Sequence, residues 1–185
     1  MGTLEVTKEK LYNFSSFLNE DGFAAQVYEP DENNIIYQLL IPITPNEGET
    51  EEETPLIQVM FVEDVLEVSG HITKEINDTF ILQFFVPILI NNQKFDINEM
   101  NIFLSYLNKL VPIGYFGNGV EGIFFRHTVV TNAKNIERET SLEIVRLISF
   151  FTKRFYKRIL ALAEGNKTKE ALLKELDDEI KGLNL

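Results

Sequence analysis

The stretch that decides the fold is Thr79–Ile90, T-F-I-L-Q-F-F-V-P-I-L-I. Its β-branched and aromatic residues favour an extended strand, and Asn91-Asn92 follows it as a turn. Neighbouring residues of a strand point to opposite faces of a sheet. Because Phe84 and Phe85 are adjacent, this strand is apolar on both faces. A sheet with two apolar faces must be covered on both of them.

Four shorter extended segments precede this stretch, at residues 23–28, 35–43, 56–61 and 65–72. The first two flank the turn residues Pro30–Asn34 and form a predicted hairpin. The last two flank Glu63-Asp64 and form a second predicted hairpin. Because successive strands with short connections pair antiparallel, the first half of the chain predicts a meander of about five strands.

Three segments carry apolar residues at helical spacing, at residues 7–19, 97–111 and 138–163. Thr7 is the predicted N-cap of the first helix. Asp96 caps the second helix, and Glu99 follows three residues later, as in a capping box. Two further predicted strands, at residues 115–116 and 122–131, separate the second helix from the third.

This order of elements predicts an α+β fold, an antiparallel β-sheet covered by amphipathic helices in the order α-β-β-β-β-β-α-β-β-α. The 185 residues are enough for a single domain, which we place at residues 1–165. Residues 166–185 form a C-terminal tail with a short predicted helix at 167–181. Residues 44–54 are an acidic surface loop, because the five glutamates of this run repel one another and cannot enter a core.

Composition narrows the classes of function. The chain has 17 Lys and Arg against 29 Asp and Glu, a net charge of −12, with two histidines and no cysteine. Disulfides and cysteine-ligated zinc are therefore excluded. Nucleic-acid binding is not expected, because phosphate contacts need a basic surface. No apolar run reaches the roughly 20 residues of a membrane span, and no secretory signal follows Met1. We expect a cytoplasmic protein that binds neither nucleic acid nor membrane.

No motif in the sequence predicts catalysis or cofactor binding. Gly117–Gly122 has the G-x-G-x-x-G spacing of a dinucleotide-binding loop, but a predicted helix precedes it and a strand follows, which is the reverse of the order needed. A turn with positive φ is the favoured interpretation. His71 and His127 lie in strand-like segments, and no nucleophile elbow occurs. We therefore predict no catalytic, cofactor-binding or metal-binding residue, and a protein that is not an enzyme.

A basic segment stands out from the acidic background. Five cations and no acid occur in it: Arg146, Lys153, Arg154, Lys157 and Arg158. The dipole of a helix favours cations in its C-terminal part, and we favour this explanation. The alternative is a patch that binds an acidic segment of a partner or the acidic loop of a neighbouring subunit.

The two apolar faces of the sheet predict a binding partner. Three helices can cover one face but not both, so we expect another chain to cover part of the sheet or of the central helix. The candidate partner-binding residues combine aromatic side chains of the strands with cations. They are Phe84, Tyr115, Phe116, Arg126, Arg146, Lys153, Arg154 and Lys157.

The second half of the chain resembles the YbjN family. The matching segments are D-I-N-E-M-N-I-F-L-S-Y-L-N-K-L at 96–110, V-P-I-G-Y-F at 111–116, G-I-F-F-R-H-T-V-V at 122–130 and F-F-T-K-R-F-Y at 150–156. The resemblance implies the fold of the type III secretion chaperones and a module that dimerises and holds other polypeptides. It implies no catalytic residue. By position, Gly114–Phe116 match the family's turn and Arg126 matches its basic strand residue, whereas the acidic loop and the tail depart from the family pattern.

The sequence thus predicts a non-enzymatic protein-binding module, chaperone-like or regulatory. We expect a homodimer that holds a polypeptide partner on an apolar sheet or groove surface, either as an extended segment at a sheet edge or as a docked helix. Two alternatives stay open. A small-molecule-binding or enzymatic domain predicts a pocket with His71 or His127 beside a carboxylate. An acidic inhibitor would instead bind a basic partner by charge mimicry.

Overall fold

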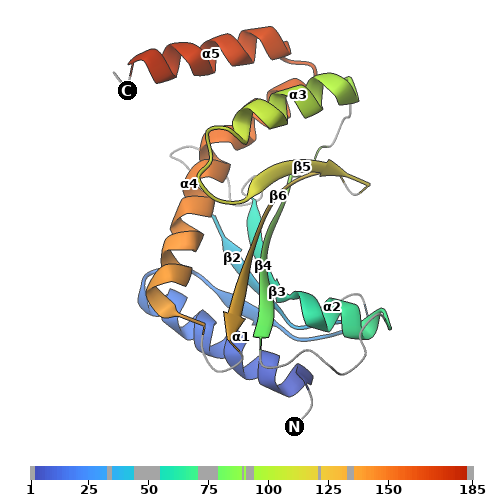
Figure 1. Ribbon diagram of the computed structural model, residues 1–185, viewed down its shortest axis with the longest axis vertical. Coiled ribbons are helices and arrows are strands. Elements are labelled where there is room, and N and C mark those ends of the chain that lie inside the picture. The colour runs from blue at the N-terminus through green and yellow to red at the C-terminus, as the bar shows by residue number, and fades with distance from the viewer. Residues whose placement is uncertain are drawn as a thin grey trace.

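The computed structural model describes residues 3–32, 35–43, 55–70, 79–88, 90, 94–120, 122–132 and 136–182. In these ranges the chain forms a six-stranded antiparallel sheet and five helices, which confirms the predicted α+β class (Figure 1). The elements are α1 (Thr3–Glu20), β1 (Gln26–Tyr28), β2 (Gln38–Pro42), β3 (Leu56–Phe61), α2 (Val62–Val68), β4 (Thr79–Ile88), α3 (Ile97–Leu107), β5 (Tyr115–Gly119), β6 (Gly122–Asn132), α4 (Arg138–Ala163) and α5 (Lys169–Gly182).

The strands lie side by side in the order β1-β2-β3-β4-β6-β5. All five pairings are antiparallel, and the longest joins β4 to β6, from Thr79 opposite Asn132 to Ile88 opposite Ile123. The stretch that predicted the longest strand is therefore the centre of the sheet. The edges of the sheet are the short strands β1 and β5.

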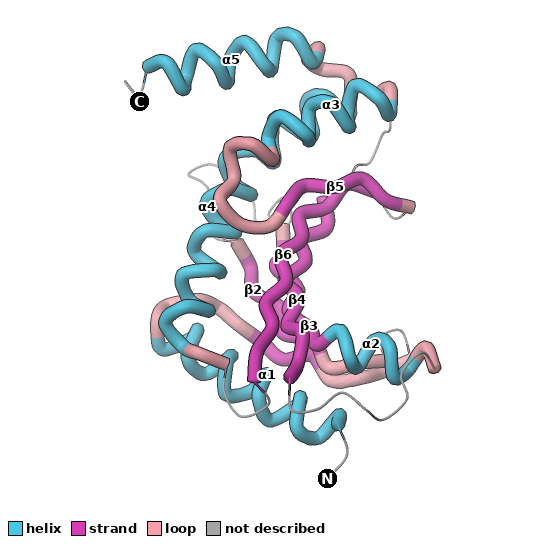
Figure 2. Tube along the Cα trace, in the orientation of Figure 1, coloured by secondary structure: helices cyan, strands magenta, loops and turns pink. Residues whose placement is uncertain are grey.

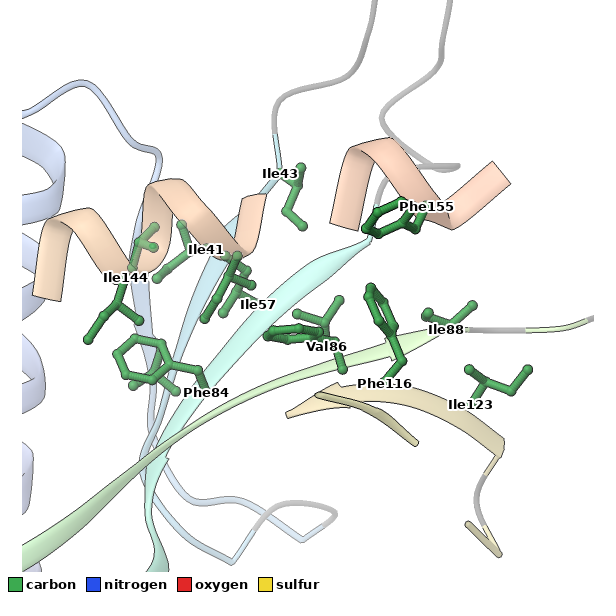
Figure 3. Close-up of a cluster of buried hydrophobic side chains, with 14 of the residues drawn as sticks. Ile41, Ile43, Ile57, Phe84, Val86, Ile88, Phe116, Ile123, Ile144 and Phe155 are labelled. Atoms are coloured by element: carbon green, nitrogen blue, oxygen red, sulfur yellow. The ribbon is translucent and has the colours of Figure 1, made fainter. Parts of the chain in front are cut away.

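One face of the sheet is covered by α1 and α4. Phe14 of α1 meets Phe84 of β4 edge-to-face at 6.4 Å between ring centres, and Phe155 of α4 meets Phe116 of β5 at 5.9 Å. Figure 3 shows Phe84, Phe116 and their neighbours beneath α4. All four rings are buried, so this layer is the main hydrophobic core.

The predicted second hairpin is wrong. Residues 62–68 form helix α2 instead of a turn and the start of a strand. Burial follows a helical pattern, because Glu63 and Asp64 are buried whereas Val65 and Val68 are exposed. The valines of V-E-D-V-L-E-V favour a strand, but their spacing also fits a helix. Residues 71–78, which complete the predicted strand, lie outside the described residues.

The predicted bounds of α4 and the predicted cap of α3 are correct, whereas the predicted cap of α1 is wrong. The third predicted helix, at residues 138–163, is α4 and spans Arg138–Ala163 as expected. Asp96 caps α3, since its side chain accepts hydrogen bonds from the backbone N–H groups of Asn98 and Glu99 at 2.7 and 3.1 Å. The predicted cap at Thr7 is wrong, because α1 begins at Thr3 and Thr7 is fully buried within it. None of the described helices has the length and apolar character needed to cross a membrane.

The C-terminal helix α5 packs against the rest of the chain. Leu172 and Leu176 are fully buried in the same core cluster as the sheet. Glu179 pairs with Arg154 and Arg158 of α4 at 3.1 and 2.9 Å. Figure 2 shows α5 alongside α3, beyond the β5 edge. The helix predicted within the tail thus exists and belongs to the same packed unit. The predicted acidic loop at 44–54 lies outside the described residues.

Candidate functional site

The candidate site is the face of the sheet opposite α1 and α4, which we call the open face. Figure 1 shows α1 and α4 on one side of the sheet. On the other side the short helix α2 lies beside the start of β4, and the described helices leave the rest of β4 and β6 uncovered. Burial alternates accordingly: Phe84 and Phe125 are fully buried, whereas the adjacent Phe85 and Phe124 are only half-buried. The open face therefore displays aromatic side chains of β4 and β6.

Strand register brings one row of open-face residues together across the sheet. Opposite partners are Leu40 and Gln58, then Gln58 and Phe85, then Phe85 and Arg126, then Arg126 and Tyr115. Neighbouring strands lie about 4.8 Å apart, so these side chains form one continuous surface. Residues from 40 to 126 in the sequence thus contribute to one site.

Three rings form an aromatic platform on the open face. Phe85 stacks on Phe124 with 5.4 Å between ring centres, and Tyr115 meets Phe124 edge-to-face at 6.0 Å. Gly117 makes this arrangement possible, because a Cβ atom there would lie 2.6 Å from Cζ of Phe124. The Phe124 ring therefore lies directly over the backbone of β5. We call Phe85, Tyr115 and Phe124 the aromatic platform.

One charge accompanies the platform. Arg126 is the only Lys, Arg, Asp or Glu in any described strand, and it lies in the row between Phe85 and Tyr115. It forms no ion pair with a side chain in the described part of the chain. In a chain with a net charge of −12, the described strands present an open face without a carboxylate.

The structure divides the predicted partner-binding residues. Tyr115, which is 44% exposed, and Arg126 are brought together on the open face. Phe84 and Phe116 are 0% and 2% exposed and belong to the core, so their prediction as surface residues is corrected. The reason is the two-residue period of a strand, which turns each of them away from its partly exposed neighbour.

The basic segment of α4 lies on the other side of the sheet. Arg146 pairs with Asp21 after α1, and also with Glu143 at 3.6 Å. Arg154 pairs with Glu179 of α5, as described above. Lys153 is half-buried and Lys157 is exposed on the same helix. None of these four joins Tyr115 and Arg126, and the ion pairs of the two arginines hold α1 and α5 to α4.

Sequence analysis missed two residues of the open face. Phe124 and Leu40 were not among the predicted partner-binding residues, although they lie within predicted strands. The available signal was the spacing of two residues between Phe124 and Arg126, which places both on one face of a strand. Leu40 carries no such signal, because its place in the row depends on pairing with β3.

The described histidine is not placed for acid–base chemistry. His127 is half-buried on the core side of β6, with its ring 6.3 Å from that of Phe84. Burial lowers the pKa of His127. His71 lies outside the described residues. No group of three or more potential metal ligands occurs among the residues that the structure describes.

Two further features, a surface depression and the glycine-rich segment, are candidates for ligand binding. A depression of about 470 Å³ lies between α3 and α5, and its lining includes no histidine or carboxylate: Asn98, Asn101, Ile102, Ser105, Tyr106, Lys109 and Leu173. Gly117–Gly122 joins β5 to β6, so a strand follows it and no helix begins there. Gly122 has a φ of +106°, which confirms the predicted turn with positive φ.

A buried pair of acids begins α2. Oε1 of Glu63 accepts a hydrogen bond from the backbone N–H of Ile81 at 2.8 Å. Asp64 is fully buried. Burial raises the pKa of Asp64 to about 6, and hydrogen bonding with Thr7 opposes part of this shift. Glu63 thus ties α2 to the start of β4, away from the aromatic platform.

In comparisons with known proteins, the chain matches no family model, no curated protein and no solved structure. The resemblance to the YbjN family therefore stays a prediction, as does the specific chaperone-like fold. The coarser statement, an α+β fold with a six-stranded antiparallel sheet and five helices in the described residues, rests on the structure itself.

Proposed function

We propose that the protein is a non-enzymatic protein-binding module that holds a polypeptide partner on the open face of its sheet. The observation that carries this proposal is the aromatic platform beside Arg126, which forms no ion pair with a side chain among the described residues. Aromatic residues and arginine dominate binding energy at protein interfaces. A contiguous exposed apolar surface of this kind is typical of an interaction site. The role is that of a chaperone-like or regulatory module.

The alternative of a small-molecule-binding or enzymatic domain receives less support. It requires a histidine beside a carboxylate in a pocket, and His127 instead faces Phe84 on the core side of β6. The depression between α3 and α5 is lined by amide, hydroxyl and apolar side chains with one lysine. Charge mimicry by the acidic loop concerns residues 44–54, which the structure does not describe.

Homodimerisation is the second part of the proposal. Apolar side chains remain exposed on helices away from the open face, namely Ile97 and Ile102 of α3 and Phe150 of α4. Such residues offer a contact between two copies that leaves the open face free for a partner. The two parts of the proposal can therefore be tested separately.

Selection from a random peptide library displayed on phage tests partner binding. We expect the protein to enrich peptides whose binding is lost in Phe124→Asp, because a buried charge on the aromatic platform opposes apolar docking. Val120→Asp is the matched control, since Val120 is fully exposed at the β5–β6 turn. The absence of peptides that depend on Phe124 would overturn the proposed function.

Light scattering after size-exclusion chromatography tests dimerisation. We expect twice the chain mass of 21.3 kDa for both the wild type and Phe124→Asp. A mass of one chain over a wide concentration range would contradict the dimer and leave the partner-binding part unaffected.

A further inference from the structure

The β5 edge of the sheet is closed by a side chain. Asn108, at the end of α3, donates from its amide nitrogen to the carbonyl of Phe116 at 2.9 Å and accepts from the N–H of Phe116 at 2.7 Å. An adjacent strand would use the same two backbone groups. β5 spans only Tyr115–Gly119, and Asn108 occupies its outward edge at the second residue, Phe116.

The opposite edge is closed in the same way. Asn19, near the end of α1, donates to the carbonyl of Ala25 at 2.9 Å and accepts from the N–H of Ala25 at 2.8 Å. The Ser15 hydroxyl donates to the same carbonyl at 2.9 Å. Ala25 directly precedes β1 (Gln26–Tyr28), which has only three residues. Both edges are thus short and capped, which disfavours the addition of a strand at either one.

Charge argues against a second copy of this chain on the open face. Two copies joined through the same face would bring two Arg126 side chains to one interface, and no described strand supplies a carboxylate. An unpaired cation buried in an interface is costly. The natural complement of this face therefore carries at least one acid of its own.

Shape favours a helix as the occupant. The opposite face of the sheet is covered by α1 and α4, which shows that this twisted sheet packs well against helices (Figure 1). An amphipathic helix presents apolar anchors at spacings of three and four residues, which suits a platform of three adjacent rings. One acid on the same or the next turn can reach Arg126.

We propose that the open face binds an amphipathic helix of a partner protein, whose apolar side chains pack on the aromatic platform and whose Asp or Glu pairs with Arg126. This inference rests on the proposed function and specifies the chemistry of the partner. It differs from strand addition at the edges, which Asn19 and Asn108 oppose, and from self-association through the open face.

Sequences enriched in the peptide selection test this inference. We expect apolar residues at helical spacing with an acid one turn away. Arg126→Glu should weaken such a peptide by about tenfold or more, and exchanging the peptide's acid for Arg should restore binding to Arg126→Glu within about threefold. The restored binding also shows that Arg126→Glu is folded. With Arg126→Gln, the affinity should lose most of its salt dependence.

The outcomes separate the two levels of the proposal. Three results would overturn the acidic helical partner and leave the proposed function standing, provided that binding still depends on Phe124. The selected peptides could carry no acid, their affinity could be unchanged in Arg126→Glu, or their apolar residues could alternate as in a strand. Asn108→Ala is the edge control, and we expect it to leave peptide affinity within about twofold. Tighter binding in Asn108→Ala would instead indicate strand addition at β5 and overturn the inference.

Discussion

The two faces of the sheet are built from the same kinds of residues but differ in how far those residues are buried. On β4, Phe84 lies under α1 and is fully buried, while Phe85 on the other face is half-buried in the aromatic platform. On β6, Phe125 and Phe124 repeat this difference. The side chains of each pair are identical, so what distinguishes the core from the partly exposed face is the coverage by helices. Apolar character alone does not identify a binding residue in this fold.

Truncating Phe84 and Phe85 of β4 in separate variants tests this difference between the faces most strongly. We expect Phe84→Ala to lower the free energy of unfolding by about 3–5 kcal/mol, because it leaves a cavity in the core. Phe85→Ala should cost about 1 kcal/mol, because its ring is partly exposed. Urea unfolding of the two variants measures both values. Equal losses would mean that both faces are covered in solution.

Burial also encloses a carboxylate at the start of α2, that of Asp64, and replacing it should stabilise the fold. The pKa of Asp64 in the folded chain, about 6, exceeds its ordinary value of 3.8. The folded state therefore binds this proton more tightly than the unfolded chain, so stability from this group is full below about pH 4 and falls as the pH rises to about 6. We expect Asp64→Asn to gain about 1–3 kcal/mol near pH 7 and little below pH 4.

Urea unfolding of the wild type and Asp64→Asn across this pH range measures the effect. Asp178→Asn is the matched control, because Asp178 is an exposed aspartate of α5. A difference between wild type and Asp64→Asn that does not change with pH would show that burial of the charge is not its cause.

Removing an edge cap should have a smaller effect on stability. Asn108→Ala loses the hydrogen bonds of 2.9 and 2.7 Å to Phe116, and we expect a cost of about 1–2 kcal/mol. The exposed edge of β5 should also promote association that increases with concentration. Asn101→Ala, on the exposed side of α3, is the control. Light scattering that is the same for both variants would contradict the role of Asn108 as a cap.

The smallest expected change in stability is at Gly117. In Gly117→Ala, the new Cβ would lie 2.6 Å from the Phe124 ring, which must move away from β5 at a cost of about 1 kcal/mol. Gly119→Ala is a graded control, since its Cβ would lie 3.3 Å from the same ring. We expect Gly117→Ala to weaken selected peptides much more than Gly119→Ala does. Unchanged peptide binding would remove the stacked platform from the site.

Features with a strong local pattern were predictable from the sequence. The long apolar stripe of α4, the cap at Asp96 and the run that forms β4 each contain enough information within one segment. The helix α2 was not predictable, because seven residues rich in valine fit both periods. Packing decides whether a short segment forms a helix or a strand. In α2, Glu63 and Asp64 pack toward β4 and α1.

The candidate site was only partly predictable. Alternation along β6 associates Phe124 with Arg126, but the choice between the two faces depends on where α1 and α4 pack. That packing joins segments more than a hundred residues apart in sequence, such as Asp21 and Arg146. Similarly, the basic segment of α4 could not be assigned until α5 placed Glu179 beside Arg154. Non-local contacts of this kind leave no mark in one sequence.

The edge caps also make the protein sensitive to chemical ageing. A cap works only while one side chain can both donate and accept, which is a property of an amide and not of a carboxylate. Deamidation of Asn19 or Asn108 would keep the acceptor for the backbone N–H and lose the donor for the carbonyl. A sample in which Asn108 is deamidated should therefore have a half-released strand edge at Phe116 of β5.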